Sequence, residues 1–377
     1  MLAFLFLFFN IAQAIVVSGP SGPWSVSHKV VELTDESRWD PYAPEDSQHK
    51  RRILTSLFIP TQKNQKKCQT EKVDYMPPKT RVGAAKTLGL PNTTFEGLEL
   101  EFCKASTKER APLPIVIFSP GFSSIRLLSS AQAKSLASQG NVVITVDHPY
   151  DGTVVEFPDG TVVYGASPND INDEVAEKGV KAGSPLPFVR SEDISFLIDE
   201  ILEPSSLGGI LDGFDTSKIF VYGHSLGGAT SAQVALNDDR VLGGLDLDGK
   251  LYGSVSEAGL DTPLFVVGAD STEEAASYFK GIMGKVDAAK MFLTVNGTGH
   301  MSFVDLPLVL SLLDFTAPGL ERSIGAIDGK RITSITDDIL GAVTSFLFKG
   351  KTRSLCQLED KVEEAVVVER DLKKACS

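Results

Sequence analysis

The chain has 377 residues, of which 42% are hydrophobic, and it carries a formal net charge of -13 at pH 7. This length and composition suffice to bury a core in one large domain or two small ones. The acidic balance argues against nucleic-acid partners and strongly anionic membranes, because no basic face is available to neutralise phosphates, whereas a neutral lipid or ester substrate is compatible with it.

The first segment, Met1–Ala14, is apolar and ends in Ala12-Gln13-Ala14, the small-x-small form of a signal-peptidase site. It is too short to span a bilayer comfortably. A mitochondrial presequence is disfavoured because no Arg precedes Arg38, and an uncleaved anchor is the other alternative. We therefore expect a cleaved signal peptide, a secreted, extracellular protein and no transmembrane span. In a secreted chain Asn92 and Asn296 are N-glycosylation acceptors, because each begins an Asn-x-Thr sequence.

Four cysteines, Cys68, Cys103, Cys356 and Cys376, fit an oxidising compartment. Four cysteines allow three pairings into two bridges, and the sequence does not choose among them. If residues 358–374 form one straight helix of roughly 25 Å, Cys356 and Cys376 lie too far apart to bond. A bond between Cys68 and Cys103 is then possible, but it leaves the other two cysteines unpaired.

The region before residue 112 gives weak structural signals. An extended segment is expected at 28–33 and an early strand at 51–60. Residues 61–94 are rich in Lys, Gln, Pro and Asn, which predicts a surface loop with little regular structure. Residues 98–102 alternate in polarity and are expected to close a hairpin.

From residue 112 the pattern becomes strand, helix, strand, which indicates a parallel sheet with crossover helices. The expected strands are 113–119, 141–147, 219–222, 243–248, 263–268 and 291–295. The expected helices are 130–138, 188–202, 232–236, 272–282 and 332–348. A hairpin is expected around Pro158-Asp159-Gly160, and the polar segment 169–185 occupies a position where hydrolases place lids. The predicted organisation is a signal peptide over 1–14, one catalytic domain over 15–355 and a charged tail over 356–377.

A catalytic motif lies at residues 218–229, which read KIFVYGHSLGGA. The apolar run 219–222 has the length of a buried strand, and the small residues after the turn can start a helix. A serine in such a turn sits on a strained backbone with its hydroxyl directed toward substrate, and the flanking glycines allow close packing. Ser225 is therefore the candidate nucleophile of a nucleophile elbow. The alternative is an inert serine in a glycine-rich turn.

A serine hydroxyl needs a base to remove its proton, and the base needs an acid to hold its tautomer. The histidines are His28, His49, His148, His224 and His300. The first two precede the predicted sheet, and the side chain of His224 is expected to point away from the Ser225 hydroxyl. His300 follows the strand 291–295 and emerges at the carboxyl edge of the sheet, so we expect it to be the base. The alternative base is His148, which follows another strand end.

The expected order of serine, acid and histidine is that of the α/β-hydrolases. It predicts an α/β-hydrolase fold, with a mostly parallel central sheet and helices on both faces. Asp248 ends the strand after the elbow, whereas Asp270 follows the next strand, where most hydrolases of this fold carry their acid. Asp246 lies deeper in its strand and ranks third. The residues alone leave Asp248 and Asp270 open.

Acyl transfer also needs hydrogen-bond donors for the developing oxyanion. The backbone N–H of Leu226, directly after the nucleophile, is one expected donor. The other is expected from the loop after strand 113–119, where we select the backbone N–H of Phe122.

Several segments together resemble motifs of the platelet-activating factor acetylhydrolase family, a branch of the α/β-hydrolases with phospholipase and short-chain esterase members. The matching segments are FSPGF at 118–122, VDHP at 146–149 with FPDG at 157–160, GHSLGG at 223–228, LDG at 247–249 and HMSFVD at 300–305. Their combination is far more specific than the elbow alone.

The resemblance implies a calcium-independent lipase or esterase with a Ser-Asp-His triad and no cofactor or metal. In that family the acid sits one strand after the nucleophile, which selects Asp248 over Asp270. The chain departs from the animal enzymes at Pro120, where they tend to have His, and at Leu226, where they have Phe. The implied substrate is a small ester or a phospholipid, met at a lipid interface. The implied activity resembles that of a 1-alkyl-2-acetylglycerophosphocholine esterase.

Two other functions are alternatives. A secreted cutinase-like polyesterase or general carboxylesterase would share the elbow and would favour Asp270 as the acid. A non-catalytic binding protein that keeps the hydrolase scaffold belongs to a different class, and covalent labelling of Ser225 would exclude it. A metal-dependent hydrolase is poorly supported, because no H-E-x-x-H or clustered Cys/His spacing occurs. The sequence leaves the oligomeric state open.

Overall fold

The computed structural model describes residues 14–63, 68–104, 111–165, 186–252, 254–270, 273–374 and 376. The expected signal peptide, apart from Ala14, and the expected lid segment 169–185 lie outside these residues. Among the helices of the described ranges, none is both long and apolar enough to cross a membrane.

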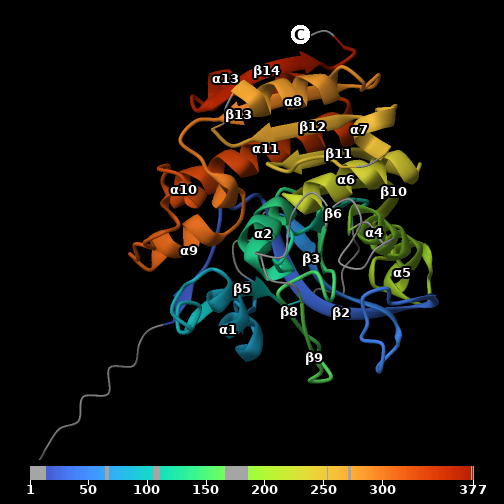
Figure 1. Ribbon diagram of the computed structural model, residues 1–377, viewed down its shortest axis with the longest axis vertical. Coiled ribbons are helices and arrows are strands. Elements are labelled where there is room, and N and C mark those ends of the chain that lie inside the picture. Colours follow the sequence, from blue (N-terminus) through green and yellow to red (C-terminus); the bar gives the residue numbers. More distant parts are fainter. Residues whose placement is uncertain are drawn as a thin grey trace, which may run out of the picture.

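A nine-stranded sheet forms the centre of the molecule, in the order β14-β13-β12-β11-β10-β6-β7-β3-β2 (Figure 1). Its strands are β2 (Trp24–Trp39), β3 (Lys50–Lys63), β6 (Pro114–Ser119), β7 (Val142–Asp147), β10 (Asp215–His224), β11 (Val241–Leu247), β12 (Leu264–Gly268), β13 (Lys290–Val295) and β14 (Ala365–Asp371). The inner run from β13 to β7 is parallel, whereas β14 at one edge and β3 and β2 at the other are antiparallel. The prediction of a mostly parallel α/β sheet is confirmed.

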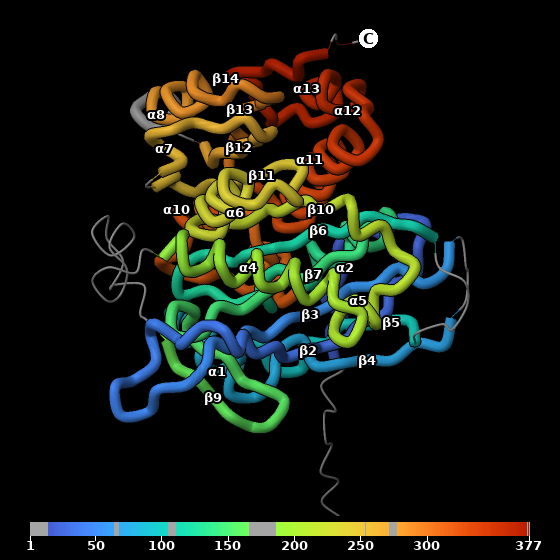
Figure 2. Tube along the Cα trace, turned by 90° about the vertical axis from the view of Figure 1, so that its right-hand side faces the viewer, coloured from blue at the N-terminus to red at the C-terminus, as the bar shows by residue number. Residues whose placement is uncertain are grey.

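Helices cover both faces of this sheet. They are α1 (Pro78–Thr87), α2 (Ser130–Ser138), α4 (Leu186–Leu202), α5 (Leu207–Ile210), α6 (Leu226–Asn237), α7 (Ser254–Ala258), α8 (Glu273–Met283), α9 (Leu306–Leu312), α10 (Glu321–Ile324), α11 (Gly329–Lys349), α12 (Arg353–Cys356) and α13 (Leu358–Lys361), with 3-10 turns η1 (Arg126–Ser129) and η3 (His300–Phe303). Figure 2 shows α7 and α8 on one side of the sheet and α11 on the other.

Strand β6 shows why the sequence produces two covered faces. Ile115 and Ile117 belong to the apolar cluster that includes the buried side of α4, whereas Val116 and Phe118 belong to the cluster that includes α2 and α11. Successive side chains of a strand point to opposite faces, so a strand without polar positions must be covered on both. This burial fixes the register of the strands that lead to the site.

The amino-terminal part contains more regular structure than expected. The predicted loop 61–94 holds β4 (Thr70–Asp74) and α1, and β4 joins β1 (Ile15–Val16) and β5 (Leu98–Cys103) in a three-stranded sheet. Strand β4 is mostly exposed and depends on pairing with β5, so its sequence has no apolar pattern to reveal it. The expectation that His28 precedes the sheet is also wrong, because His28 lies in β2. The predicted hairpin forms β8 (Val154–Glu156) and β9 (Val162–Tyr164).

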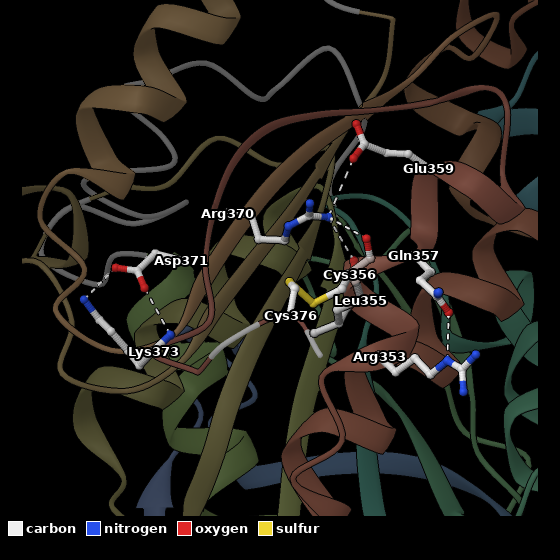
Figure 3. Close-up of a disulfide and its surroundings, with 9 residues drawn as sticks. All are labelled: Arg353, Leu355, Cys356, Gln357, Glu359, Arg370, Asp371, Lys373 and Cys376. Atoms are coloured by element: carbon white, nitrogen blue, oxygen red, sulfur yellow. Dashed lines mark hydrogen bonds and ion pairs between the residues drawn. A yellow bond between two sulfur atoms is a disulfide. The ribbon is translucent and has the colours of Figure 1, made fainter.

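The carboxyl-terminal segment is part of the fold. Residues 358–374 are not one straight helix, because α13 ends at Lys361 and β14 pairs with β13 at the sheet edge. The chain therefore turns back, and Cys356 and Cys376 form a disulfide with Cα atoms 5.6 Å apart (Figure 3). Strand β14, which lies within the expected tail 356–377, is therefore an edge strand of the central sheet. Cys68 and Cys103 form the other disulfide.

Candidate active site

The elbow serine lies between β10 and α6. Ser225 has φ 55° and ψ -123°, a strained conformation for a residue with a side chain, and its N–H donates to the Leu247 carbonyl over 2.9 Å. A Cβ atom at Gly227 would lie 2.0 Å from the Ser119 carbonyl oxygen, so only glycine permits α6 to approach β6 this closely. This local geometry is that of a nucleophile elbow.

The strand register brings the other predicted residues to the same edge. His224 at the end of β10 is paired with Leu247 at the end of β11, so Ser225 and Asp248 leave adjacent strands at the same level. Parallel strands end at a common edge of the sheet, where α/β proteins place their sites. His300 reaches this edge from the loop that follows β13.

His300 and Asp248 are joined by a hydrogen bond. Nδ1 of His300 lies 2.7 Å from Oδ2 of Asp248, and the other carboxylate oxygen of Asp248 accepts from the Ala269 N–H over 2.7 Å. The side chains of His300 and Asp248 are 46% and 20% exposed, so the ring is accessible while the carboxylate is partly shielded. The Nδ1 contact leaves Nε2 of His300 as the nitrogen available to a nucleophile.

A cavity of about 340 Å³ opens over these residues, and its wall is largely apolar. Ser225 and His300 line it together with the two expected oxyanion residues, Phe122 and Leu226. Other lining residues are Ala84, Thr87 and Leu88 of α1, Lys250 and Tyr252 after β11, and Met301, Leu320 and Ser323. The three α1 residues were not predicted to line the site, because α1 lies in the segment 61–94 that was expected to be a loop.

The two expected oxyanion donors have no competing acceptor among the described residues. Within the described part of the chain, the backbone N–H groups of Phe122 and Leu226 donate to no protein atom, whereas the next N–H in the loop, that of Ser123, donates to the Asp151 carbonyl over 2.9 Å. Two unpaired N–H groups beside a serine are suited to accept an anionic oxygen.

The alternative acids lie elsewhere. Asp270 contacts the loop before His300, where its carboxylate accepts from the Gly297 N–H over 3.4 Å and its N–H donates to Thr298 over 3.3 Å. No contact between Asp270 and His300 occurs among the described residues. Asp246 is fully buried beneath the elbow, and burial raises the pKa of its carboxyl well above the usual range. Of the three carboxyl groups, only that of Asp248 contacts the His300 ring.

The alternative base, His148, belongs to a buried polar set. Its Nε2 lies 3.0 Å from the Ser119 hydroxyl and its Nδ1 lies 2.8 Å from Oδ2 of Asp193. This arrangement has the same three residue types as a catalytic triad, yet the side chains of His148 and Asp193 are 0% exposed. Burial lowers the pKa of His148, and no substrate can reach it.

The remaining histidines have structural positions. His224 is buried, and its Nε2 lies 2.7 Å from the His300 carbonyl oxygen, so it holds the backbone of the residue that bears the accessible ring. Burial and the neighbouring His300 lower the pKa of His224 to about 3, which keeps it neutral. His49 contacts the Tyr150 hydroxyl over 2.8 Å. The ring of His28 packs against the rings of Phe58 and Phe102, which also contact each other.

The predicted acceptor asparagines are at the surface. Asn92 lies in the exposed turn after α1, and Asn296 is the exposed residue directly after β13. In the described ranges, His, Cys, Asp and Glu side chains form no group of three or more that could hold a metal ion.

Comparison with protein families gives a match over most of the chain. A family model described as "Platelet-activating factor acetylhydrolase, isoform II" matches residues 45–156 and 197–328. The "Probable 1-alkyl-2-acetylglycerophosphocholine esterase" of Arthroderma benhamiae is 30% identical over 269 residues, which cover 67% of this chain and 63% of that protein. The "Platelet-activating factor acetylhydrolase" of Bos taurus is 25% identical over 221 residues, covering 52% of this chain and 49% of that protein. The matches thus span less than two thirds of these relatives.

A solved structure matches at nearly full length. The ferulic acid esterase from Streptomyces cinnamoneus superposes with a TM-score of 0.77 at 25% sequence identity. The superposition covers 94% of this chain and 100% of the esterase chain. The two proteins therefore share their whole fold.

Proposed function

Because the chain belongs to the platelet-activating factor acetylhydrolase, isoform II, family, we propose that it hydrolyses carboxylic esters through an acyl-enzyme formed on Ser225. The observation that carries this proposal is the 2.7 Å contact of Asp248 with His300, whose side chain lines the same cavity as Ser225. Family membership and site geometry both support this chemistry.

Ser225 acts as the nucleophile and His300 as the base. As Oγ attacks the ester carbonyl carbon, its proton passes to Nε2 of His300, and the carbonyl electron pair moves to the oxygen. The imidazolium then gives the proton to the leaving alkoxide as the ester bond breaks. Water deacylates the serine by the same steps in reverse order. Asp248 holds the Nδ1–H tautomer and stabilises the imidazolium charge.

The backbone N–H groups of Phe122 and Leu226 bind the oxyanion. Removing one such donor costs about a hundredfold to a thousandfold in kcat in other hydrolases. Both N–H groups lack a described protein acceptor and belong to residues that line the cavity, which supports this role.

The substrate is a glycerophosphocholine ester with a short acyl group at the reacting position. The names of the fungal and bovine relatives support this class. A cavity of about 340 Å³ holds a short acyl group and part of the glycerol but not a whole phospholipid, so the rest of the lipid stays outside. The two disulfides support secretion, with cleavage after Ala14 and glycans on Asn92 and Asn296.

A second substrate class is an aromatic or polymeric carboxylic ester. The observation that favours it is the full-length superposition on a ferulic acid esterase. The same Ser225 chemistry serves either class, because only the groups around the reacting carbonyl differ.

A substrate panel with purified protein tests the function. We expect release of acetate from 1-alkyl-2-acetylglycerophosphocholine, unchanged by a chelator and abolished by Ser225→Ala. Faster turnover of a feruloyl ester or an aliphatic polyester would select the second class. No hydrolysis of any ester would contradict the proposed function and favour a binding protein.

A further inference from the structure

A buried arginine holds the loop that supplies one oxyanion donor. Arg190, on α4, has a side chain that is 0% exposed, and its Nε and Nη2 donate to the two carboxylate oxygens of Asp151, each over 2.6 Å. Its remaining hydrogen bonds go to two successive backbone carbonyls. Nη1 donates to the Pro120 oxygen, and Nη2 donates to the Gly121 oxygen over 3.2 Å. A buried guanidinium is costly unless every donor is paired, and here the loop provides part of that pairing.

These contacts determine the direction of the Phe122 N–H. The Gly121 carbonyl and the Phe122 N–H belong to one planar trans peptide, in which the two groups point in opposite directions. When Arg190 binds the carbonyl, the N–H must point away from the guanidinium. The hydrogen bond also polarises the peptide, because hydrogen bonds in a chain strengthen one another.

The loop needs support from other residues because its backbone is flexible at Gly121. A Cβ atom at this position would lie 3.2 Å from Cβ of Ser225 and 3.3 Å from Nδ1 of His224, which is tight enough to favour glycine. Glycine gives the backbone more freedom than any other residue. The Gly121–Phe122 peptide must have a fixed orientation, yet it begins at the residue type with the most flexible backbone. Contacts from outside the loop are therefore needed to fix it.

Helix α4 holds the loop at a second point. Asp193, three residues after Arg190 and so on the same helix face, accepts from the His148 ring, which in turn contacts the Ser119 hydroxyl at the end of β6. The Asp151 carbonyl binds the Ser123 N–H on the other side of the donor. The loop is therefore bound before, at and after Gly121.

We propose that Arg190 is a positioning residue, which orients and polarises the Gly121–Phe122 peptide so that its N–H binds the oxyanion. The proposal rests on the proposed esterase function. Arg190 is not among the residues that line the cavity, and it acts only through this peptide. Its loss should weaken the binding of tetrahedral adducts while it leaves ground-state binding and the base unchanged.

The test compares Arg190→Met, Arg190→Lys and the control Arg126→Met. Arg126 is also buried and pairs with Asp147, but its guanidinium donates to no carbonyl of the loop. We expect a loss in kcat of about tenfold to a hundredfold for Arg190→Met, which is smaller than the loss on removal of an oxyanion donor because the N–H remains and is only misdirected. We expect a smaller loss for Arg190→Lys, whose ammonium cannot pair with Asp151 and both carbonyls in one fork. Arg126→Met should keep kcat within about threefold of the wild-type value when its lower stability is controlled by circular dichroism.

The affinity for a transition-state analogue separates the positioning role from a merely structural one, because a residue that only stabilises the fold would not change this affinity selectively. A trifluoromethyl ketone forms a hemiketal when Ser225 Oγ bonds to its carbonyl carbon, with the serine proton moving to His300 and the oxyanion facing Phe122 and Leu226. Its inhibition constant should rise in proportion to the loss of kcat in each folded Arg190 variant. KM and the kinetic pKa in the kcat/KM profile should stay at their wild-type values, because Arg190 does not contact His300.

Several results would overturn the proposal. A folded Arg190→Met or Arg190→Lys protein with wild-type kcat would do so, as would a loss of kcat without a matching loss of ketone affinity. If Arg126→Met lowered kcat as much as Arg190→Met does, the effect would reflect a general loss of stability and not the orientation of the peptide. If Arg190→Met does not fold, Arg190→Lys, which keeps the charge opposite Asp151, decides the question. Wild-type hydrolysis that Ser225→Ala abolishes establishes the esterase function separately, and its absence would overturn both proposals.

Discussion

Nδ1 of His300 lies 2.7 Å from Oδ2 of Asp248, although 52 positions separate the two residues in the chain. Two different strand ends create this contact. Asp248 follows β11, whose pairing with β10 places it beside the elbow, and His300 follows β13, two strands further along the sheet. Asp248 also has φ 56°, a left-handed conformation that aspartate tolerates and that marks the sharp turn after the strand.

The roles of the two candidate acids can be separated by amide substitutions. We expect Asp248→Asn to lower kcat by about ten-thousandfold, the effect seen when a triad acid loses its charge and the wrong histidine tautomer forms. Asp270→Asn is the matched control, since Asp270 contacts only the 297–298 loop and should keep most of the activity. Steady-state hydrolysis of one soluble ester measures both. Greater damage from the Asp270 change would reverse the assignment of the acid.

Lys250 is expected to contribute to recognition of a phosphate group. Among the described residues that line the cavity, it is the one with a permanent positive charge, and its Nζ lies 5.5 Å from the centre of the Tyr252 ring. We predict that Lys250→Met raises KM for a phosphocholine ester about threefold to tenfold, because an exposed charge pair contributes modestly. Hydrolysis of a neutral acetyl ester should be unchanged. Equal effects on both esters would show that Lys250 does not discriminate by charge.

The carboxyl-terminal disulfide should contribute to stability and not to catalysis. Cys356 and Cys376 are separated by 20 positions, and closing a loop of this size stabilises a protein by about 3 kcal/mol. The cavity lining, as far as the chain is described, contains no cysteine. The double change Cys356→Ser/Cys376→Ser should therefore lower the free energy of urea unfolding by this amount while kcat/KM stays constant. A large loss of kcat/KM in the folded variant would contradict this separation.

Stability should fall in mild acid because of His28, which is partly buried in β2. Burial, together with the positive charge of Arg126, lowers the pKa of His28 to about 4, whereas an unfolded histidine titrates near 6.5. The unfolded chain thus binds a proton that the folded chain excludes. The contribution of neutral His28 to the free energy of unfolding is fully present above about pH 6.5. It is lost as the pH falls toward 4, and the free energy of unfolding then decreases by up to about 1.4 kcal/mol per pH unit.

The substitution His28→Phe tests this cause of acid sensitivity. Phenylalanine cannot be protonated and keeps the aromatic contacts with Phe58 and Phe102. Urea unfolding at several pH values between 7.5 and 4.5 should show a shallower decline for the variant. Parallel declines of variant and wild type would assign the acid sensitivity to other groups, among them His224, whose pKa lies near 3.

The parallel part of the fold could be predicted because its strands are long apolar runs. Helix α2 begins and ends at the predicted residues, Ser130 and Ser138, and the elbow strand is buried from Ile219 onward. Two-sided burial favours runs of consecutive apolar residues in such strands, a pattern that a single sequence displays without help from distant residues.

The parts that escaped prediction depend on long-range pairing. The exposed strand β4 is held by β5 and has no apolar pattern, and β14 is held by β13 and has an apolar run of only four residues, AVVV, inside a charged segment. The turn between α13 and β14 brings Cys356 and Cys376 together. No hydrophobic periodicity in the sequence predicts this turn. Arg190 also left no local signal, since its partners in the 120–121 loop lie about 70 residues away.

Covalent labelling tests the central claim most directly. A fluorophosphonate reacts with a serine only where a neighbouring base accepts its proton and donors bind the phosphoryl oxygen. Mass spectrometry of the treated protein should find one adduct, located on Ser225, that is absent in Ser225→Ala and forms far more slowly in His300→Ala. An unmodified wild-type protein, or an adduct on any residue other than Ser225, would contradict the account.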